Sequence, residues 1–132
     1  MVKVIASPDC GNSPKKLFLQ QFNIAQAEGD IDRVAASVRD DITWDIVGNT
    51  RIEGKAAYIE AVEQMKSQAK DELIIHAIIT HGKEGAVRGE FRMSSGATVA
   101  FCDVYTFGGA KGDSLASIVS YLIDISEESA PA

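Results

Sequence analysis

The sequence predicts an α+β domain in which a curved, antiparallel-rich sheet wraps around three N-terminal helices. Helical spacing of apolar residues is confined to the part of the chain before residue 71. The part after it consists of apolar or alternating stretches that are separated by turns rich in glycine and serine. Helices segregated from a run of antiparallel strands are typical of the α+β class. A chain of 132 residues, 45 % of them hydrophobic, is enough for one domain with a real core.

The first predicted helix begins at Ser13-Pro14, because serine is a favoured N-cap and proline a favoured first helical residue. Its apolar face is formed by Leu17, Phe18, Phe22 and Ala25. Gly29 ends this helix, and Asp30 caps a short second helix. A third helix begins near Gly54. The apolar stripe of this helix is formed by Tyr58, Ile59, Val62 and Met65. Its solvated residues are Glu63, Lys66 and Lys70.

Strands are predicted at residues 42–47, 73–81, 86–93, 98–107 and 115–125. The stretch LIIHAIITH is apolar on both faces, which favours a central position in the sheet. The predicted organisation is an N-terminal extension at 1–12, a single domain at 13–126 and a flexible tail at 127–132. Within the extension, VKVI either extends along a neighbouring strand or stays loose. Such a sheet must twist, and three helices on one side would close it into a cone whose mouth is a natural pocket.

Composition and motifs exclude several classes of function. The net charge is −6 and Lys15-Lys16 is the one adjacent basic pair, so we expect no nucleic-acid surface. No apolar run reaches membrane-helix length, and the N-terminus lacks a signal-peptide pattern, so we expect a cytoplasmic protein. Cys10 and Cys102 have no CxxC spacing and are expected to be reduced. No HxH, HExxH or phosphate-loop motif occurs, so neither a metal nor a cofactor is expected.

The strand FCDVYTF contains an unusual aspartate, Asp103. Parity places it on the same face as the bulky residues Phe101 and Tyr105, and we expect this face to line the concave interior. Aspartate is depleted in strands, and a buried carboxyl either stays protonated or ionises beside a cation. Two interpretations stay open: Asp103 is a hydrogen-bonded acid that only fixes the packing, or it contacts a ligand or takes part in catalysis.

Arg88 is the candidate cation for Asp103. If the SSGA hairpin is regular, residues whose numbers sum to 191 face each other, which pairs Arg88 with Asp103. A one-residue bulge would replace Arg88 by Val87 or Gly89. The pattern of Val87, Phe91 and Met93 as a buried face also argues against the regular pairing.

Four further residues are candidates for the pocket. Trp44, the single tryptophan, packs in the core or stacks on a ligand. His76 lies in the middle of a strand and is either an acid or base facing the pocket or a histidine satisfied in the core or an interface. Tyr58 and Tyr121 can supply hydroxyl groups to the cavity or fill the core. The expected site therefore has Asp103 and His76 as catalytic candidates, and a set of ligand-binding candidates: Trp44, Tyr58, Arg88, Phe101, Tyr105 and Tyr121.

Three stretches resemble the nuclear transport factor 2-like superfamily, and within it the SnoaL-like and ketosteroid-isomerase-like proteins. They are AEGDIDRVAASVRDDITWDI, IEGKAAYIEAV, and VAFCDVYTF followed by ASIVSYLID, and the resemblance covers about residues 14–125. It implies a cone-shaped, cystatin-like fold. It says little about function, because the same fold serves isomerases, cyclases, hydrolases, dehydratases and non-catalytic adaptors.

The resemblance also implies positions for catalytic groups. Asp103 falls where the ketosteroid isomerases have an oxyanion-hole aspartate, but their general base and their tyrosine are replaced here by Ile46 and Phe22. The epoxide-hydrolase branch uses an arginine and two aspartates, for which Arg88 and Asp103 are partial matches and Ser120 takes the place of the second aspartate. Steroid isomerisation by the family mechanism is therefore not expected.

Two functions remain open at this stage. The first is a pocket that binds an apolar or aromatic small molecule, with acid–base chemistry if the protein is an enzyme. The second is a non-catalytic dimeric module in which Asp103 is structural. In both cases the small residues of the convex sheet face, together with the habit of the family, imply a homodimer through that face. A cavity of a few hundred Å³ with Asp103 and a second titratable group on its wall would favour the first.

Overall fold

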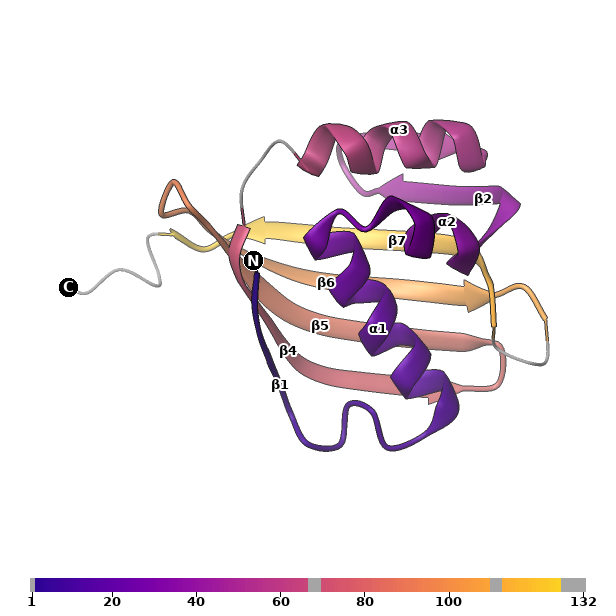
Figure 1. Cartoon of the computed structure of the whole chain (residues 1–132), viewed down its shortest axis with the longest axis horizontal. Helices are drawn as coiled ribbons and strands as arrows, with labels where there is room; N and C mark the ends of the chain where they lie inside the picture. The colour runs from indigo at the N-terminus through magenta and orange to yellow at the C-terminus, as the bar shows by residue number, and fades with distance from the viewer. Residues whose placement is uncertain (1, 67–69, 110–112, 127–132) are drawn as a thin grey trace.

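A computed structural model of the chain describes residues 2–66, 70–109 and 113–126. Within these residues it contains three helices and one seven-stranded sheet (Figure 1). The helices are α1 (Pro14–Glu28), α2 (Ile31–Ser37) and α3 (Lys55–Lys66). The strands are β1 (Lys3–Ala6), β2 (Val38–Ile46), β3 (Thr50–Glu53), β4 (Lys70–His81), β5 (Glu84–Met93), β6 (Thr98–Phe107) and β7 (Leu115–Asp124). The predicted α+β class is confirmed, and the predicted tail at 127–132 lies outside the described residues.

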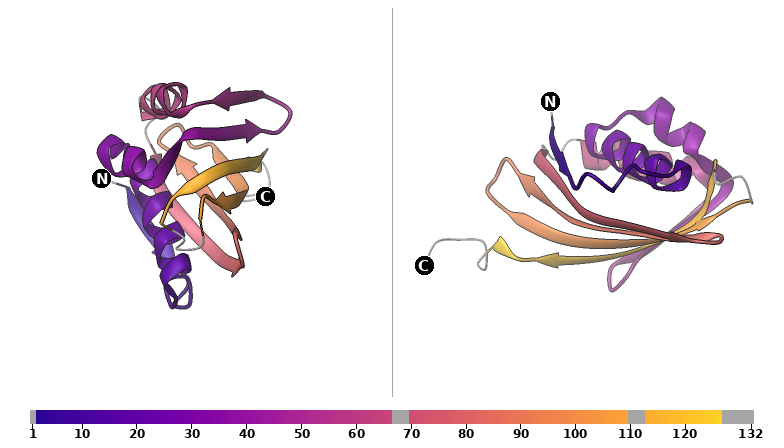
Figure 2. Two further views of the ribbon diagram at one scale, coloured as in Figure 1. Left: turned by 90° about the vertical axis from the view of Figure 1, so that its right-hand side faces the viewer. Right: turned by 90° about the horizontal axis from the view of Figure 1, so that it is seen from below.

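The sheet curves around the helices, which all lie on its concave side (Figure 2). Its strand order is β1-β4-β5-β6-β7-β2-β3. The pairs β1–β4 and β2–β7 are parallel, and the other neighbours are antiparallel. The segment VKVI thus takes the first of its two predicted alternatives and extends along β4. The short strand β3 was not predicted, because Ile52 is the one apolar residue among its four.

The ends of α1 follow the sequence signals. The Ser13 hydroxyl accepts a hydrogen bond from the Lys16 amide, and Gly29 adopts a left-handed conformation with φ 69°. The predicted apolar face was wrong at Leu17, which is 46 % exposed, and it lacked Leu19, which is fully buried; Phe22 and Ala25 are buried as predicted. Leu19 lies one helical turn before Asn23, so the face that meets the sheet includes a polar residue.

The strand β4 contains two irregularities that decide which side chains face the helices. Its pairing with β5 shifts by one residue between Lys70 and Glu72, and again between Ile75 and Ala77. An extra residue in one strand reverses the alternation of side chains beyond it. As a result of the first shift, Lys70 shares the concave face with Met93. His76 lies on the convex face, because it directly follows the buried Ile75.

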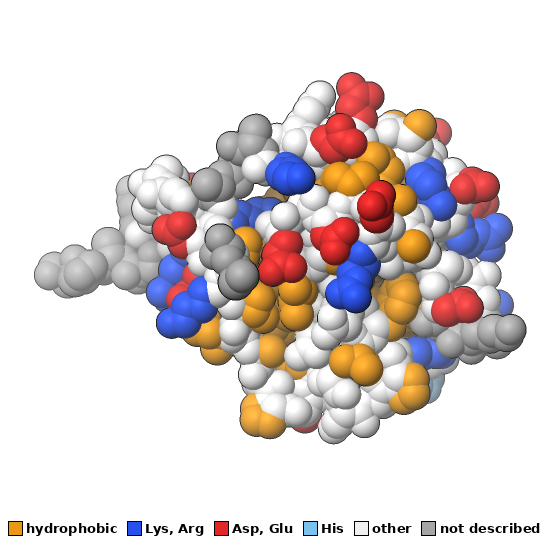
Figure 3. Space-filling model, viewed as in Figure 1, with side chains coloured by type: hydrophobic (Ala, Val, Ile, Leu, Met, Phe, Trp, Pro, Cys, Tyr) orange, Lys and Arg blue, Asp and Glu red, His pale blue; other side chains and the backbone are white. Residues whose placement is uncertain are grey.

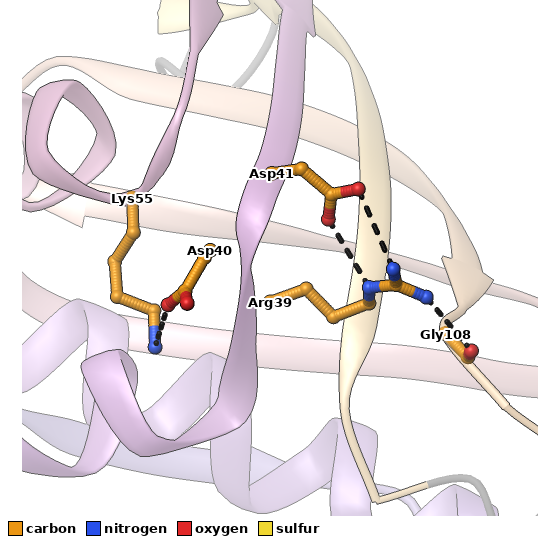
Figure 4. Close-up of polar contacts among 5 residues, drawn as sticks. All are labelled: Arg39, Asp40, Asp41, Lys55 and Gly108. Atoms are coloured by element: carbon orange, nitrogen blue, oxygen red, sulfur yellow. Dashed lines mark hydrogen bonds and ion pairs between the residues drawn. The ribbon is translucent and has the colours of Figure 1, made fainter.

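Polar contacts tie the start of β2 to its neighbours (Figure 4). The Arg39 guanidinium donates to the Gly108 carbonyl at 3.1 Å, beside the end of β6, and pairs with Asp41 at 3.1 Å. Lys55, the first residue of α3, pairs with Asp40 at 3.3 Å. These contacts anchor the strand that carries Trp44 into the core.

The core lies between the helices and the concave face. Its largest fully buried side chains are Tyr58, Tyr105, Phe107, Leu19, Ile42, Ile75 and Leu115. None of the helices in the described part of the chain combines the length and apolar character that are needed to cross a lipid bilayer.

Candidate functional site

A cavity of about 70 Å³ lies on the concave face, between the helices and the middle of the sheet. Side chains from α1, α3, β2 and the strands β4 to β7 line it: Asn23, Gln26, Ala27, Trp44, Met65, Lys70, Leu73, Phe91, Phe101, Asp103, Ser120 and Leu122. Of the predicted site residues, Trp44, Phe101 and Asp103 therefore meet at one cavity.

Asp103 is 8 % exposed and is held by two neighbouring hydroxyl groups. The Tyr105 hydroxyl donates to its Oδ2 at 3.2 Å. Ser120 lies directly across from it on β7 and hydrogen-bonds to the carboxyl group. The Ser120 hydroxyl also accepts from Trp44 Nε1 at 2.8 Å, so the indole, the hydroxyl and the carboxyl form one chain.

A helix residue completes this network. Asn23 Nδ2 donates to the Tyr105 hydroxyl at 3.0 Å and to the Leu19 carbonyl at 2.8 Å. Tyr105 is 1 % exposed and lies behind Asp103 rather than on the cavity wall. Tyr105 thus links Asn23 of α1 to the carboxyl group of Asp103 and fixes the orientation of that group. Sequence analysis missed Asn23; the signal that could have found it is its spacing of one helical turn from Leu19 on the buried face of α1.

The environment of Asp103 brings its pKa close to neutrality. Burial raises the pKa and outweighs the hydrogen bonds from Ser120 and Tyr105 and the positive charge of Lys70, which lower it, so that the resulting pKa is about 6. The pKa values of Tyr58 and Tyr105 are raised well above their usual range, first by burial and then by the charge of Asp103. A buried carboxyl group with such a pKa can either donate or accept a proton near neutral pH.

Lys70 is a second site residue, besides Asn23, that sequence analysis missed. It was assigned to the solvated side of the third helix, but it begins β4 and lines the cavity. Its Nζ lies 5.0 Å from the centroid of the Phe91 ring. Burial lowers the pKa of Lys70, and the charge of Asp103 opposes that change. No sequence signal could have revealed its orientation, because the irregularity after Lys70 decides it.

Three predicted residues lie on the opposite face of the sheet. The β5–β6 register places Val87 across from Asp103 and pairs Arg88 with Cys102, so the hairpin takes the offset alternative and Arg88 does not face Asp103. His76 Nε2 contacts Glu90 Oε2 at 2.9 Å, and Tyr121 is 49 % exposed. Together with Cys102, the residues His76, Arg88 and Tyr121 line a shallow hollow of the convex face.

The remaining candidate, Tyr58, supports the cavity from behind. Its ring packs edge-on against Trp44 with centroids 5.3 Å apart, and its hydroxyl hydrogen-bonds to Gln26. Phe101 stacks on Phe91 with centroids 6.0 Å apart. At the position of the isomerase tyrosine, Phe22 packs edge-on against Tyr105. These aromatic contacts form the apolar part of the cavity wall, and its polar part consists of Asn23, Gln26, Lys70, Asp103 and Ser120.

A larger apolar trough of about 680 Å³ adjoins the cavity. The two share Phe91 and Leu122, and the trough continues over Met93 and Val99 to the ends of the strands. Figure 3, which looks onto the helix side, shows hydrophobic side chains at the surface beside α1. The site therefore has a small inner chamber with polar groups and a wide apolar entrance.

Comparison with known proteins places this architecture. The sequence profile of the SnoaL-like domain matches residues 19–114. No functionally curated protein matches the chain. Among solved structures, an NTF2-like protein of unknown function from Cytophaga hutchinsonii is 27 % identical with a TM-score of 0.67, covering 81 % of this chain and 97 % of that one.

Two enzyme structures share the fold at lower identity. An LEH-like epoxide hydrolase of M. tuberculosis is 22 % identical with a TM-score of 0.66, covering 81 % of this chain and 80 % of that one. The epoxide hydrolase/cyclase-like enzyme SalBIII, which has a role in pyran ring formation in the polyether salinomycin, is 19 % identical with a TM-score of 0.72. The match covers 83 % of this chain and 90 % of that one.

Proposed function

Because the chain belongs to the SnoaL-like domain family of the nuclear transport factor 2-like superfamily, we propose that it binds an apolar small molecule and performs acid–base chemistry on it with Asp103. The resemblance stated from the sequence is thereby confirmed, and the proposal concerns the finer question of activity. The observation that carries it is Asp103 itself, a buried carboxyl group on a cavity wall with a pKa of about 6.

The proposed chemistry uses both protonation states of Asp103. In the protonated state it donates to an oxygen of the ligand, and in the ionised state it withdraws a proton from carbon or from water. Tyr105 and Ser120 hold the carboxyl group in place in both states. The named activities of the epoxide hydrolase and of SalBIII support this class of reaction, in which an oxygen atom gains or loses a proton.

The test is turnover of a panel of apolar epoxides, ketones and hydroxy-ketones, followed by mass spectrometry. We expect Asp103→Asn to lower turnover on the order of a hundredfold or more, as for loss of a general acid or base. Asp45→Asn is the matched control, because Asp45 lies on β2 in register with Val119, away from the cavity. Equal turnover by the wild type and Asp103→Asn would refute the catalytic role.

The small inner chamber favours a second candidate, a non-catalytic dimeric module. A volume of about 70 Å³ admits only a few heavy atoms, well below the usual range for ligand pockets. Titration of the Trp44 fluorescence separates the two functions, since Trp44 lines the chamber. A ligand that quenches this fluorescence at micromolar concentration supports the first candidate, and a panel without any effect supports the second.

We also propose that two copies associate through the convex sheet face. Three large apolar side chains are exposed there: Ile79 by 65 %, Tyr121 by 49 % and Ile123 by 63 %. Small residues lie between them in the register of β5, β6 and β7, among them Ala100 and Cys102. Arg88 and Glu90 lie two residues apart on the same face. Across a two-fold axis, Arg88 of one copy can pair with Glu90 of the other.

A further inference from the structure

Two groups of opposite charge lie on the wall of the inner chamber without forming a direct ion pair. Lys70 comes from β4 and Asp103 from β6, with β5 between them. The ion pairs among the described residues do not include these two. Both line the same chamber, and the charge of each favours the ionised form of the other. Both side chains therefore face the space that a ligand group in the chamber would occupy.

We propose that Lys70 and a protonated Asp103 together hold the carboxylate of an apolar monocarboxylic acid, whose body lies in the adjoining trough. This inference rests on the proposed binding function and adds to it the chemical class of the ligand. It also gives Lys70 a role in binding that the resemblance to the family does not supply.

The charge of the chamber determines the protonation state. Without ligand, an ionised Asp103 and a charged Lys70 give a net charge of zero. A ligand carboxylate adds one negative charge, and two carboxylates side by side in a buried site do not both stay ionised. One proton, taken up by Asp103, restores neutrality and lets the two carboxyl groups share a hydrogen bond. With a pKa of about 6, roughly a tenth of Asp103 is already protonated at about pH 7.

Lys70 is suited to the cationic role by its position. Its ammonium group lies over the face of the Phe91 ring, an arrangement that favours the charged form. The charge of Asp103 favours the same form, whereas burial opposes it. A ligand carboxylate would add a second negative partner to this cation.

The dimensions of the site divide the ligand into two parts. The chamber of about 70 Å³ has room for little more than two water molecules, which suits a carboxylate. The trough of about 680 Å³ has apolar walls from Phe91, Met93, Ala97, Val99 and Leu122, and its polar residues are Ser94, Ser95 and Asp124. The apolar walls suit an unbranched or cyclic apolar body. Because Phe91 and Leu122 border both spaces, one molecule can occupy the two together.

The experiment is calorimetric titration with octanoate between about pH 6.5 and 8.5, in buffers of different ionisation enthalpy. We expect the uptake of close to one proton per octanoate bound, and an affinity that falls about tenfold per pH unit, because only the protonated Asp103 binds. Of the groups that face Asp103, Tyr58 and Tyr105 titrate above this range. Among the described residues of the chamber wall, Lys70 is the other titratable group, and the variants below separate its effect from that of Asp103.

Three variants test the two residues separately. Lys70→Met should weaken octanoate binding by about tenfold to a hundredfold, the usual effect of losing a charged hydrogen bond. Lys66→Met, which removes an exposed lysine outside the chamber, is the matched control and should bind like the wild type. Asp103→Asn should bind octanoate without proton uptake and without the tenfold dependence on pH. If Lys70→Met unfolds, Lys70→Gln serves in its place.

Octanol, with the same chain and no charge, distinguishes the possible failures. Octanoate binding that is as tight in Lys70→Met as in Lys66→Met, or that takes up no proton in the wild type, would overturn the inference. Binding of octanol but not of octanoate would overturn it as well and leave the proposed pocket intact. If neither compound changes the Trp44 fluorescence or gives heat, the acid inference fails for this chain, and the panel of neutral compounds described above decides the binding function.

Discussion

At the scale of single residues, the site depends on how strongly burial acts on Asp103. Two hydroxyl groups and one lysine stabilise the ionised carboxylate, but burial has the larger effect and raises the pKa from 3.8 to about 6. The tyrosine, serine and asparagine of the network keep the carboxyl group oriented whether or not it carries a proton. The fold therefore tolerates an acid that is destabilising when ionised, which is common at functional sites.

Replacing Asp103 by asparagine should change how stability depends on pH. Below about pH 4 the carboxyl group is protonated in both the folded and the unfolded chain. Between about pH 4 and 6 the unfolded chain loses this proton first, so the free energy of unfolding of the wild type falls by about 3 kcal/mol, and it levels off above that range. Asp103→Asn should lack this decrease in urea unfolding and be the more stable protein at about pH 8.

The control for this prediction is Asp45→Asn, which leaves the cavity unchanged. It should retain the decrease between about pH 4 and 6. A wild type whose unfolding free energy rises across this window would contradict the account, because a rise requires a carboxyl pKa that is lowered on folding.

At the scale of elements, the two irregularities of β4 position the site. Without the first, Lys70 would alternate to the convex face, and the second lets Ile75 and Ile78 both face the core although they are three residues apart. Gly89 pairs with Ile75 beside the second one. A Cβ atom on Gly89 would lie 2.0 Å from the Ile74 carbonyl oxygen. The two strands therefore approach each other so closely at this position that only glycine fits.

Gly89→Ala should therefore destabilise the protein by about 3 kcal/mol or more, since a backbone atom cannot move aside without breaking the pairing of β4 with β5. Gly109→Ala is the matched control, because its Cβ would meet nothing within 4 Å. Thermal unfolding of the two variants is the measurement. Equal midpoints would show that the approach of the two strands is looser than described.

At the scale of the whole molecule, one sheet separates two kinds of surface. Its concave face holds the chamber, and its convex face exposes Ile79, Tyr121 and Ile123 together with the His76–Glu90 pair. A homodimer through the convex face would cover the exposed apolar side chains and leave the trough open to ligands. Binding and association would then be independent, apart from effects transmitted through β5 and β6.

The double variant Ile79→Lys and Ile123→Lys should convert the proposed dimer into a monomer, because association would bury two charges without partners. Size-exclusion chromatography with light scattering at micromolar concentration measures this. Leu17→Lys is the control, since Leu17 is 46 % exposed on α1, which lies on the concave side of the sheet. A wild type that is monomeric at these concentrations would rule out the proposed dimer.

Several features followed from the sequence alone because they depend on neighbours along the chain. Capping residues marked the ends of α1, periodicity marked its existence, and alternation placed Trp44, Phe101 and Asp103 on the concave side. The resemblance of three stretches to one superfamily agreed with these local signals. Local conformational preferences and side-chain alternation act over a few residues, so a linear pattern contains enough information about them.

Other features were decided by the tertiary structure. The offset of the β5–β6 hairpin turned Arg88 away from Asp103, and the first irregularity of β4 brought Lys70 to the chamber. The position of Ser120 beside Asp103 likewise depends on the pairing of β6 with β7. A shift of one residue costs little within a strand, but it reverses every side chain beyond it. The hydrogen bonds and packing of the complete sheet select among these registers, and they involve residues far apart in the chain.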